Sequence, residues 1–227
     1  MTAVSAPAVV AIDGPAASGK GTVAKGVAQA LGFHYLDSGA LYRLVALKAL
    51  RQAIPVDDET ALATAAGELD ASFEGDAVSL GGDDVAEAIR DEAVGVAASR
   101  VAVYPRVRSA LLHWQRSFRR APGLVAEGRD MGTEVFPDAV LKAYITASAE
   151  ERARRRYNQL IMKGNSVTID GLLRDIQERD ARDSNRAEAP LKVAADAVVL
   201  DTTDLTIDAA IAFVVRQYRA LAAAERK

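Results

Sequence analysis

The sequence contains no cysteine and only two histidines among its 227 residues. Disulfide bonds and cysteine-bound zinc are therefore excluded, and His34 and His113 are too isolated to predict a metal site. Aromatic residues make up 5% of the chain, and no apolar run reaches the length that a membrane-spanning helix needs. Residues 1–7 lack the charged start and apolar centre of a signal peptide, so we expect a cytoplasmic protein without a membrane partner.

The charge balance gives little basis for a nucleic-acid partner. The chain has 28 Lys and Arg against 31 Asp and Glu, a formal net charge of −3, and half of its residues are hydrophobic. A general nucleic-acid binder would carry a basic surplus instead. At this length the chain can bury one sizeable core with an inserted subdomain. We expect a monomer that binds no nucleic acid.

The most informative stretch is residues 9–22. A short apolar run predicts a buried strand, helical spacing of apolar residues resumes after the stretch, and Gly14-x-x-x-x-Gly19-Lys20 lies between them. This is the pattern of a phosphate-binding loop, or P-loop. Glycines let backbone N–H groups turn onto phosphate oxygens, the following helix adds partial positive charge, and Lys20 reaches the terminal phosphates. The stretch therefore predicts a nucleotide site.

The residue after the lysine departs from the generic P-loop, where a serine or threonine binds magnesium. Gly21 stands there, and the hydroxyl comes one position later at Thr22. We therefore expect Mg²⁺ to be held by the phosphates of the nucleotide, by water and by more distant carboxylates, because this ion keeps its waters. Glu127 follows a buried strand and is the candidate for a nearby acid. The alternative is an ordinary charged residue at a strand end.

Strands alternate with helices along most of the chain, which predicts a parallel, doubly wound α/β sheet. Residues 71–74 and 77–80 instead alternate as a small hairpin, so we place them in an insertion. The other strands are expected at 9–12, 33–36, 124–126, 139–146 and 197–200. Helices are expected after the P-loop, at 40–53, 58–66, 85–90 and 92–102, after Pro105, and at 149–162, 168–186 and 207–221.

Charged residues follow the strands of this sheet. Ligands of open α/β sheets bind at the carboxyl ends of the strands, where Arg43 and the pair Arg129-Asp130 are expected. Arg43 is suited to clamp a phosphate, and Arg129-Asp130 suits a ligand with a phosphate and a polar ring. The alternatives are a solvated helix arginine and a structural ion pair.

Two late helices are rich in arginine. The first carries Arg152, Arg155 and Arg156. On the second, positions 179, 182, 183 and 186 share one helix face. An arginine stripe of this kind is often only solvated, but beside a P-loop it predicts a lid that closes over transferring phosphates.

These motifs resemble the bacterial cytidylate kinases, a family of nucleoside monophosphate kinases, nearly end to end. The most specific segments are residues 12–22, 37–43, 127–133 and 179–186. The resemblance implies a kinase that transfers the γ-phosphate of ATP to CMP or dCMP in pyrimidine nucleotide metabolism. It also implies a P-loop NTPase fold with a five-stranded parallel core (about 1–66, 104–148 and 190–227), an inserted NMP-binding domain (about 67–103) and a short lid (about 149–189).

The resemblance also implies roles for individual residues. The catalytic residues are Lys20, Arg129, Arg155 and Arg179. The ATP phosphates bind at Gly14, Pro15, Ala16, Ala17, Ser18, Gly19, Lys20, Gly21 and Thr22. CMP binds at Ser38, Arg43, Ser99, Arg108, Arg129, Asp130, Arg179, Asp183 and Arg186. Some relatives have a serine at position 21, an aspartate at 127 and a serine at 16, where this chain has Gly21, Glu127 and Ala16.

Two other functions fit the P-loop. One is a kinase for another small acceptor, such as shikimate or a different nucleoside monophosphate. A hydroxylated acid carries no nucleobase. The insert and the residues Arg108, Asp130 and Arg186 would then have no ligand group to bind. The other is a nucleotide-binding switch without turnover, for which we would expect a basic binding face.

Overall fold

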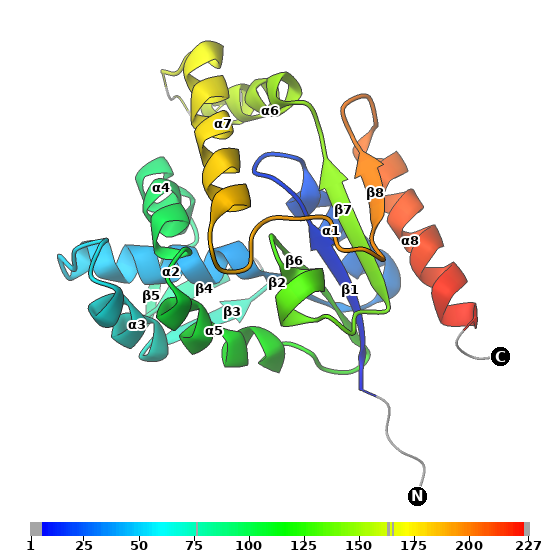
Figure 1. Ribbon diagram of the computed structural model, residues 1–227, viewed down its shortest axis with the longest axis horizontal. Helices are drawn as coiled ribbons and strands as arrows, with labels where there is room; N and C mark the ends of the chain where they lie inside the picture. The colour runs from blue at the N-terminus through cyan, green and yellow to red at the C-terminus, as the bar shows by residue number, and fades with distance from the viewer. Residues whose placement is uncertain (1–5, 76, 163, 165, 225–227) are drawn as a thin grey trace, which may run out of the picture. The chain divides into compact units, whose positions relative to one another are not determined.

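The computed structural model describes residues 6–75, 77–162, 164 and 166–224. The chain forms two compact units (Figure 1). Of the described residues, those up to Leu36 and those from Phe118 onward form the first unit, and residues 37–117 form the second. The predicted NMP-binding insert lies within the second unit, and the predicted lid lies within the first.

The first unit is built on a five-stranded sheet in the order β2-β6-β1-β7-β8. The central strand β1 pairs in parallel with β6 on one side and with β7 on the other, and β7 pairs in parallel with β8. The predicted parallel α/β sheet is confirmed. The strands are β1 (Ala8–Asp13), β2 (His34–Asp37), β6 (Gly123–Gly128), β7 (Leu141–Thr146) and β8 (Val198–Asp201).

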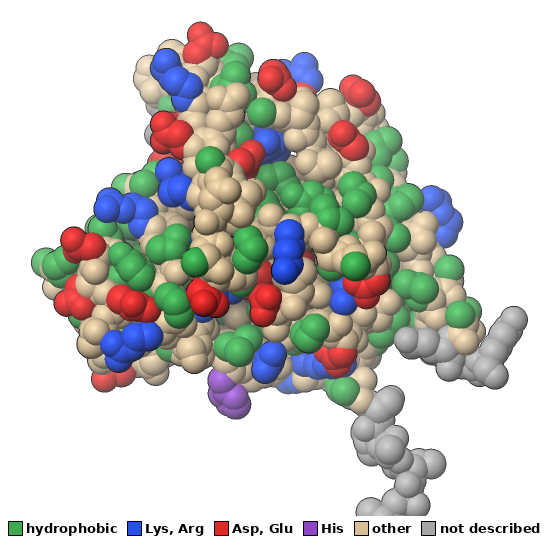
Figure 2. All heavy atoms as spheres, in the orientation of Figure 1, with side chains coloured by type: hydrophobic (Ala, Val, Ile, Leu, Met, Phe, Trp, Pro, Cys, Tyr) green, Lys and Arg blue, Asp and Glu red, His purple; other side chains and the backbone are tan. Residues whose placement is uncertain are grey.

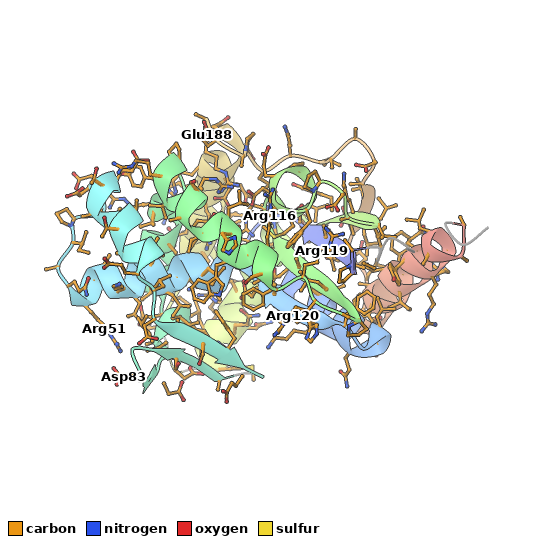
Figure 3. All side chains as sticks on the ribbon, turned by 90° about the horizontal axis from the view of Figure 1, so that it is seen from below. Arg51, Asp83, Arg116, Arg119, Arg120 and Glu188 are labelled. Carbon is orange, nitrogen blue, oxygen red and sulfur yellow. The ribbon has the colours of Figure 1, made fainter. Side chains whose placement is uncertain are left out.

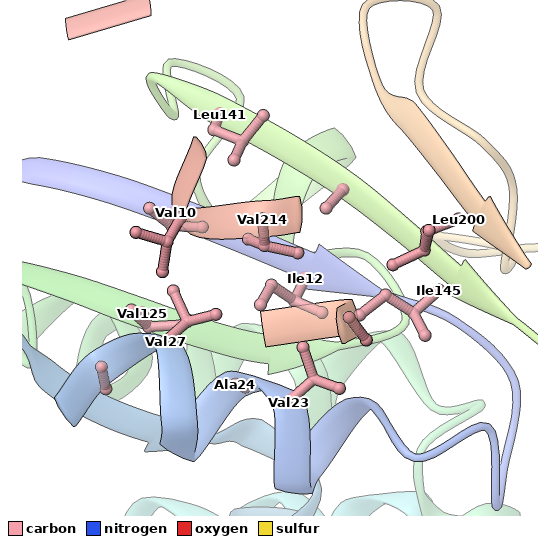
Figure 4. Packing of buried hydrophobic residues seen from close by; sticks show 14 residues of the cluster. Val10, Ile12, Val23, Ala24, Val27, Val125, Leu141, Ile145, Leu200 and Val214 are labelled. Carbon is pink, nitrogen blue, oxygen red and sulfur yellow. The ribbon is translucent and has the colours of Figure 1, made fainter. Parts of the chain in front are cut away.

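Helices α1 (Lys20–Leu31) and α8 (Ile207–Ala224) pack against one face of this sheet (Figure 4). Val10 of β1, Val125 of β6, Val27 of α1 and Val214 of α8 are all fully buried in the cluster between them. Each such side chain contributes about 1.5–3 kcal/mol when it leaves water. This cluster fixes the end of α1 that receives the P-loop.

Two further helices, α6 (Ala149–Met162) and α7 (Ile169–Asn185), form a hairpin with a small core of its own. The Thr168 hydroxyl accepts a hydrogen bond from the Gly171 amide and caps α7, as is usual at a helix N-terminus. The core consists of Ala153, Leu160, Leu172 and Ile176. This hairpin corresponds to the arginine-rich helices predicted from the sequence.

The second unit contains the predicted hairpin. Strands β3 (Ala71–Glu74) and β4 (Ala77–Leu80) pair antiparallel, and a short β5 (Asp83–Asp84) extends the sheet. Arg51, at the end of α2, lies 3.2 Å from Asp83 of β5 (Figure 3). The helices of this unit are α2 (Ser38–Arg51), α3 (Glu59–Gly67), α4 (Glu92–Val101) and α5 (Pro105–Ser117).

Two local predictions were wrong or incomplete. The helix expected at 85–90 is only a 3₁₀ turn, η1 (Ala88–Arg90), because the Val85 amide is hydrogen-bonded to Val78 and extends the sheet contact instead. A π-helical turn, η2 (Met131–Val135), was not predicted. No helix within the described part of the chain is both long enough and apolar enough to span a membrane.

Candidate active site

The P-loop joins β1 to α1, and its glycines are needed for different reasons. A Cβ atom at Gly14 would lie 2.0 Å from the Ile145 carbonyl oxygen, so only glycine fits. Gly19 has a φ of 85° at the start of α1, a conformation that side chains disfavour. The Ser18 hydroxyl is buried and has no hydrogen-bond partner among the described residues. The predicted strand, loop and helix are present in this order.

Lys20 and Glu127 form an ion pair at the carboxyl end of the sheet. Lys20 Nζ lies 3.3 Å from Glu127 Oε2, and both side chains are about nine-tenths buried. The Tyr35 hydroxyl donates a hydrogen bond of 2.9 Å to Glu127 Oε1. The acid predicted to lie near the P-loop lysine therefore does so.

Asp13 joins the end of β1 to the turn η2. Its two carboxylate oxygens accept hydrogen bonds of 2.8 Å from the backbone amides of Met131 and Gly132. Burial raises the pKa of Asp13 to about 6, with a smaller contribution from Asp130, and the two backbone donors and Arg129 only partly offset this rise. Asp13 was not singled out in the sequence beyond its place at the strand end.

We expect the native Asp13 carboxyl to titrate near pH 6 in carbon-13 NMR. Because its pKa is raised above the ordinary 3.8, the native state binds this proton more tightly than the unfolded state. The stabilisation is complete below about pH 3.8 and is lost as the pH rises through 6, by about 3 kcal/mol in total. A native midpoint near 4 would contradict the expected cost of burial.

Arg129, the residue after β6, pairs with Asp183 of α7. Arg129 Nε donates to Asp183 Oδ2 at 2.8 Å, and both side chains are largely buried. Burial alone would lower the pKa of Arg129 and raise that of Asp183, but their mutual attraction reverses both directions. Arg179 also lowers the pKa of Asp183. The pair is therefore charged on both sides at neutral pH.

Asp130 and Arg186 form a second, looser pair in this unit. Arg186 Nη2 lies 3.8 Å from Asp130 Oδ1, although the two side chains are only 4% and 5% exposed. Arg186 Nε donates to the Ala189 carbonyl. At 3.8 Å the two charges attract each other without a short hydrogen bond between these atoms.

Two arginines of α6 hold the backbone of the P-loop. Buried Arg152 forms a bidentate pair with Asp180 of α7, at 3.1 and 2.6 Å, and also donates to the Ala16 carbonyl. Arg155 donates to the Ser18 carbonyl at 3.2 Å and to the Thr202 carbonyl after β8 at 2.6 Å. In this structure Arg155, a predicted catalytic residue, therefore contacts carbonyl groups of the site.

Four of the predicted CMP-binding residues belong to the second unit. Ser38 is the first residue of α2, and the Ser99 hydroxyl of α4 is buried without a hydrogen-bond partner among the described residues. Arg43 Nη1 donates to the Ile89 carbonyl at 2.7 Å. The Arg108 guanidinium of α5 lies 5.9 Å from the centre of the Tyr42 ring.

The profile of the cytidylate kinase family matches residues 10–220. The cytidylate kinase of Cupriavidus pinatubonensis is 58% identical over 213 residues, covering 94% of this chain and 96% of that protein. That of Burkholderia ambifaria is 60% identical over 213 residues, covering 94% of this chain and 93% of that protein. The chain belongs to the cytidylate kinase family.

A comparison of structures supports the fold of this family member. An uncharacterized protein from Eubacterium ventriosum has a TM-score of 0.52 at 13% identity, with 93% of this chain and 98% of that chain covered. At this identity the likeness shows a shared fold only. The parallel sheet and its P-loop make this fold an α/β P-loop NTPase fold.

The structure of this cytidylate kinase family member also explains one departure in its P-loop. A Cβ atom at Gly21 would lie 2.7 Å from Glu127 Oε1, which is shorter than real carbon–oxygen contacts of this kind. The Glu127 carboxylate thus fills the space that a side chain at position 21 would need, and the absence of a side chain at Gly21 makes room for it. Tyr35, which holds the same carboxylate, was missed in the sequence because nothing about a tyrosine in a short strand marks it as a site residue.

Proposed function

We propose that this member of the cytidylate kinase family transfers the γ-phosphate of ATP to CMP or dCMP, forming ADP and CDP or dCDP. The observation that carries this proposal is the placement of the Lys20–Glu127 pair at the P-loop in the same unit as two buried arginine–aspartate pairs. A P-loop supplies the ATP phosphate site. Buried charged groups gathered beside a P-loop are suited to receive a charged, polar ligand.

The reaction requires positioning more than covalent chemistry from the protein. The phosphate of CMP is already a nucleophile at neutral pH, so the protein must align it with ATP and neutralise charge on the transferring group. Lys20 serves this role at the ATP phosphates. We propose that Arg129, Arg155 and Arg179 assist it, each after exchanging part of its present contacts for phosphate oxygens.

The residues at the P-loop fit a magnesium ion that is held mainly by phosphates and water. Within the described ranges, no group of three or more histidine or acidic side chains forms a metal site. The carboxylate of Glu127 beside Lys20 is the acidic group of the protein at this point. When bound with ATP, Mg²⁺ supplies charge neutralisation at the phosphates, and Glu127 and the P-loop would hold it with its waters.

We propose that CMP, the acceptor nucleotide, is bound by residues of the first unit and by residues of the second unit. In the second unit we propose that Arg43 and Ser38 bind the phosphate of CMP, and that Ser99 and Arg108 contact the nucleoside. The buried, unpartnered hydroxyl of Ser99 supports this role, since a ligand group would satisfy it. In the first unit, Arg129 and Asp183 are proposed to hold the sugar and phosphate, and Asp130 and Arg186 the base.

The alternative functions receive less support. A hydroxylated acid such as shikimate would leave the buried Asp130 and Arg186 without a base to bind. A switch that binds nucleic acid would present a basic face, but Figure 2 shows basic and acidic side chains interspersed on the face in view. We propose that the protein acts as a monomer without nucleic acid.

The direct test is a coupled assay of ADP release with each of CMP, dCMP, UMP, AMP and shikimate as acceptor. We expect CMP and dCMP to give turnover at least about a hundredfold above the rate without acceptor. ATP hydrolysis that is slow and unchanged by CMP would favour the nucleotide switch. Turnover with shikimate alone would favour the other kinase.

Closure of the α6–α7 hairpin predicts a specific pattern of hydrogen exchange. Amides from 149 to 186 should exchange more slowly with CMP and a non-hydrolysable ATP analogue together than with either alone, because closure excludes water. Since Arg152 and Arg155 already tie the start of α6 to the P-loop, we expect the larger gain in α7. Equal protection without any ligand would show that the hairpin is a fixed surface.

A further inference from the structure

Glu127 lies at the edge of the apolar cluster beneath α1. Alternation along β6 places Val125 and Glu127 on the same face, and Val125 belongs to that cluster. Tyr35, on the neighbouring strand β2, packs against the same cluster, and its hydroxyl reaches Glu127 Oε1 at 2.9 Å. A partly buried tyrosine ring packed against this cluster can thus hold the carboxylate with little freedom of its own.

The fixed carboxylate fills the space beside position 21. The same oxygen, Glu127 Oε1, would lie 2.7 Å from a Cβ atom at Gly21. In the generic P-loop this position carries the hydroxyl that binds magnesium. Here an oxygen of Glu127 stands next to the position from which that hydroxyl would extend.

The two oxygens of Glu127 have different partners. We expect the contact with Lys20 to be lost when ATP binds and the contact with Tyr35 to be kept. Oε2 faces Lys20 at 3.3 Å, and Lys20 is the residue that the ATP phosphates attract. Oε1 is held by Tyr35, which carries no charge and has no reason to move. Once Lys20 turns to the phosphates, the Tyr35 hydrogen bond is the contact that keeps the carboxylate in place.

We propose that Tyr35 is a positioning residue for the magnesium ion that accompanies ATP: it holds Glu127 in the space that Gly21 leaves open, so that this carboxylate replaces the missing P-loop hydroxyl. The inference rests on the proposed function, because it assigns a role within the ATP site. A hydrogen bond to a charged group is stronger than one between neutral groups. Loss of the Tyr35 hydroxyl should therefore weaken the magnesium contribution without removing it.

A purely structural role for Tyr35 would have a different signature. A bond that only ties β2 to β6 would lower the melting temperature when removed, and it would affect ATP binding equally with and without magnesium. A positioning role changes the ratio of the two affinities. The test therefore measures binding under both conditions in addition to stability.

The experiment is calorimetric titration of a non-hydrolysable ATP analogue, once with excess Mg²⁺ and once with EDTA. In Tyr35→Phe we expect the affinity with Mg²⁺ to fall about three- to tenfold while the affinity with EDTA is unchanged. Tyr218→Phe is the matched control, since Tyr218 packs against the same cluster from α8; it should keep the parental ratio. An unchanged ratio in Tyr35→Phe would overturn the proposal.

The reciprocity of positions 21 and 127 gives a second test. Gly21→Ala should lower the magnesium-dependent gain in affinity, because its Cβ atom displaces the carboxylate and it brings no hydroxyl in exchange. Adding Glu127→Asp shortens the acid and should restore that gain to within about threefold of the parent. If the double variant lost as much of the magnesium-dependent gain as the two single variants lose in sum, positions 21 and 127 would not compete for the same space. Parental protein that binds the Mg²⁺ complex but does not phosphorylate CMP would refute the proposed function and leave this inference standing.

Discussion

Replacing Lys20 by alanine is expected to lower CMP-dependent turnover by two or more orders of magnitude, equivalent to about 3 kcal/mol or more of transition-state stabilisation. Lys20 is the cation of the P-loop, and charge neutralisation at the phosphates is the main contribution that this site can make. Lys192→Ala, which removes the same charge from an exposed position of the same unit, should keep most of the activity. The measurement is the coupled ADP assay at saturating ATP and CMP.

The effect of Lys20→Ala on stability must be separated from its effect on activity. Removing Lys20 leaves the largely buried Glu127 carboxylate with Tyr35 as its hydrogen-bond partner but without this cation, and an unpaired buried charge is costly. We therefore expect a lower melting temperature, which Lys20→Met with Glu127→Gln should recover. That double variant should stay inactive. Near-parental turnover in any folded variant without Lys20 would refute the assignment of the ATP site.

Selection of the base should depend on Asp130. A carboxylate accepts a hydrogen bond from the exocyclic amino group of cytosine, and arginine donates to acceptors on the ring, as we propose for Arg186 and Arg108. Uracil presents a carbonyl where cytosine presents the amino group. With Asp130 almost fully buried, that mismatch leaves polar groups unpaired and should favour CMP over UMP by about a hundredfold or more.

Asp130→Asn offers a donor to the uracil carbonyl, so it should depress turnover of CMP and narrow the ratio between CMP and UMP. The ratio of kcat/KM values for the two nucleotides is the quantity to measure. Asp196→Asn is the matched control, because Asp196 pairs with Lys142 at the surface of the same unit; it should leave the ratio unchanged. A parental ratio in Asp130→Asn would assign the Asp130–Arg186 pair a structural role.

Local patterns were enough to predict the parts of the fold that depend on short-range physics. The P-loop, the apolar strands around it and the hairpin at 71–80 all follow from spacing within a few residues. The turn η2 does not, since its first amides are held by Asp13, more than a hundred positions away in the sequence. The error at η1 has a nearer cause, since the Val85 amide is hydrogen-bonded to Val78, seven positions back, and helical spacing of apolar residues does not reveal that bond.

In the candidate site, too, residues marked by a local motif were predicted and contacts between distant segments were not. Lys20 was predicted from the P-loop motif and Glu127 from its place at the end of a buried strand, since the ends of parallel strands meet at one edge of a sheet. The partners of Arg152 and Arg155 were not predicted, because an arginine on a helix does not show which carbonyl or carboxylate it reaches. Tyr35 was missed for the same reason.

The α6–α7 hairpin has a mechanical consequence. The buried residues of its small core come from its own two helices, and Ala17 of the P-loop packs against them, so the hairpin can turn as a stiff body about this contact. Arg152 and Arg155 bind the P-loop near the start of α6, while the far end of that helix lies about 10–15 Å further along its axis at 1.5 Å per residue. A rotation of about ten degrees at this contact would carry the far end through about 2–3 Å. The arrangement is a lever whose short arm is in contact with the phosphate-binding loop.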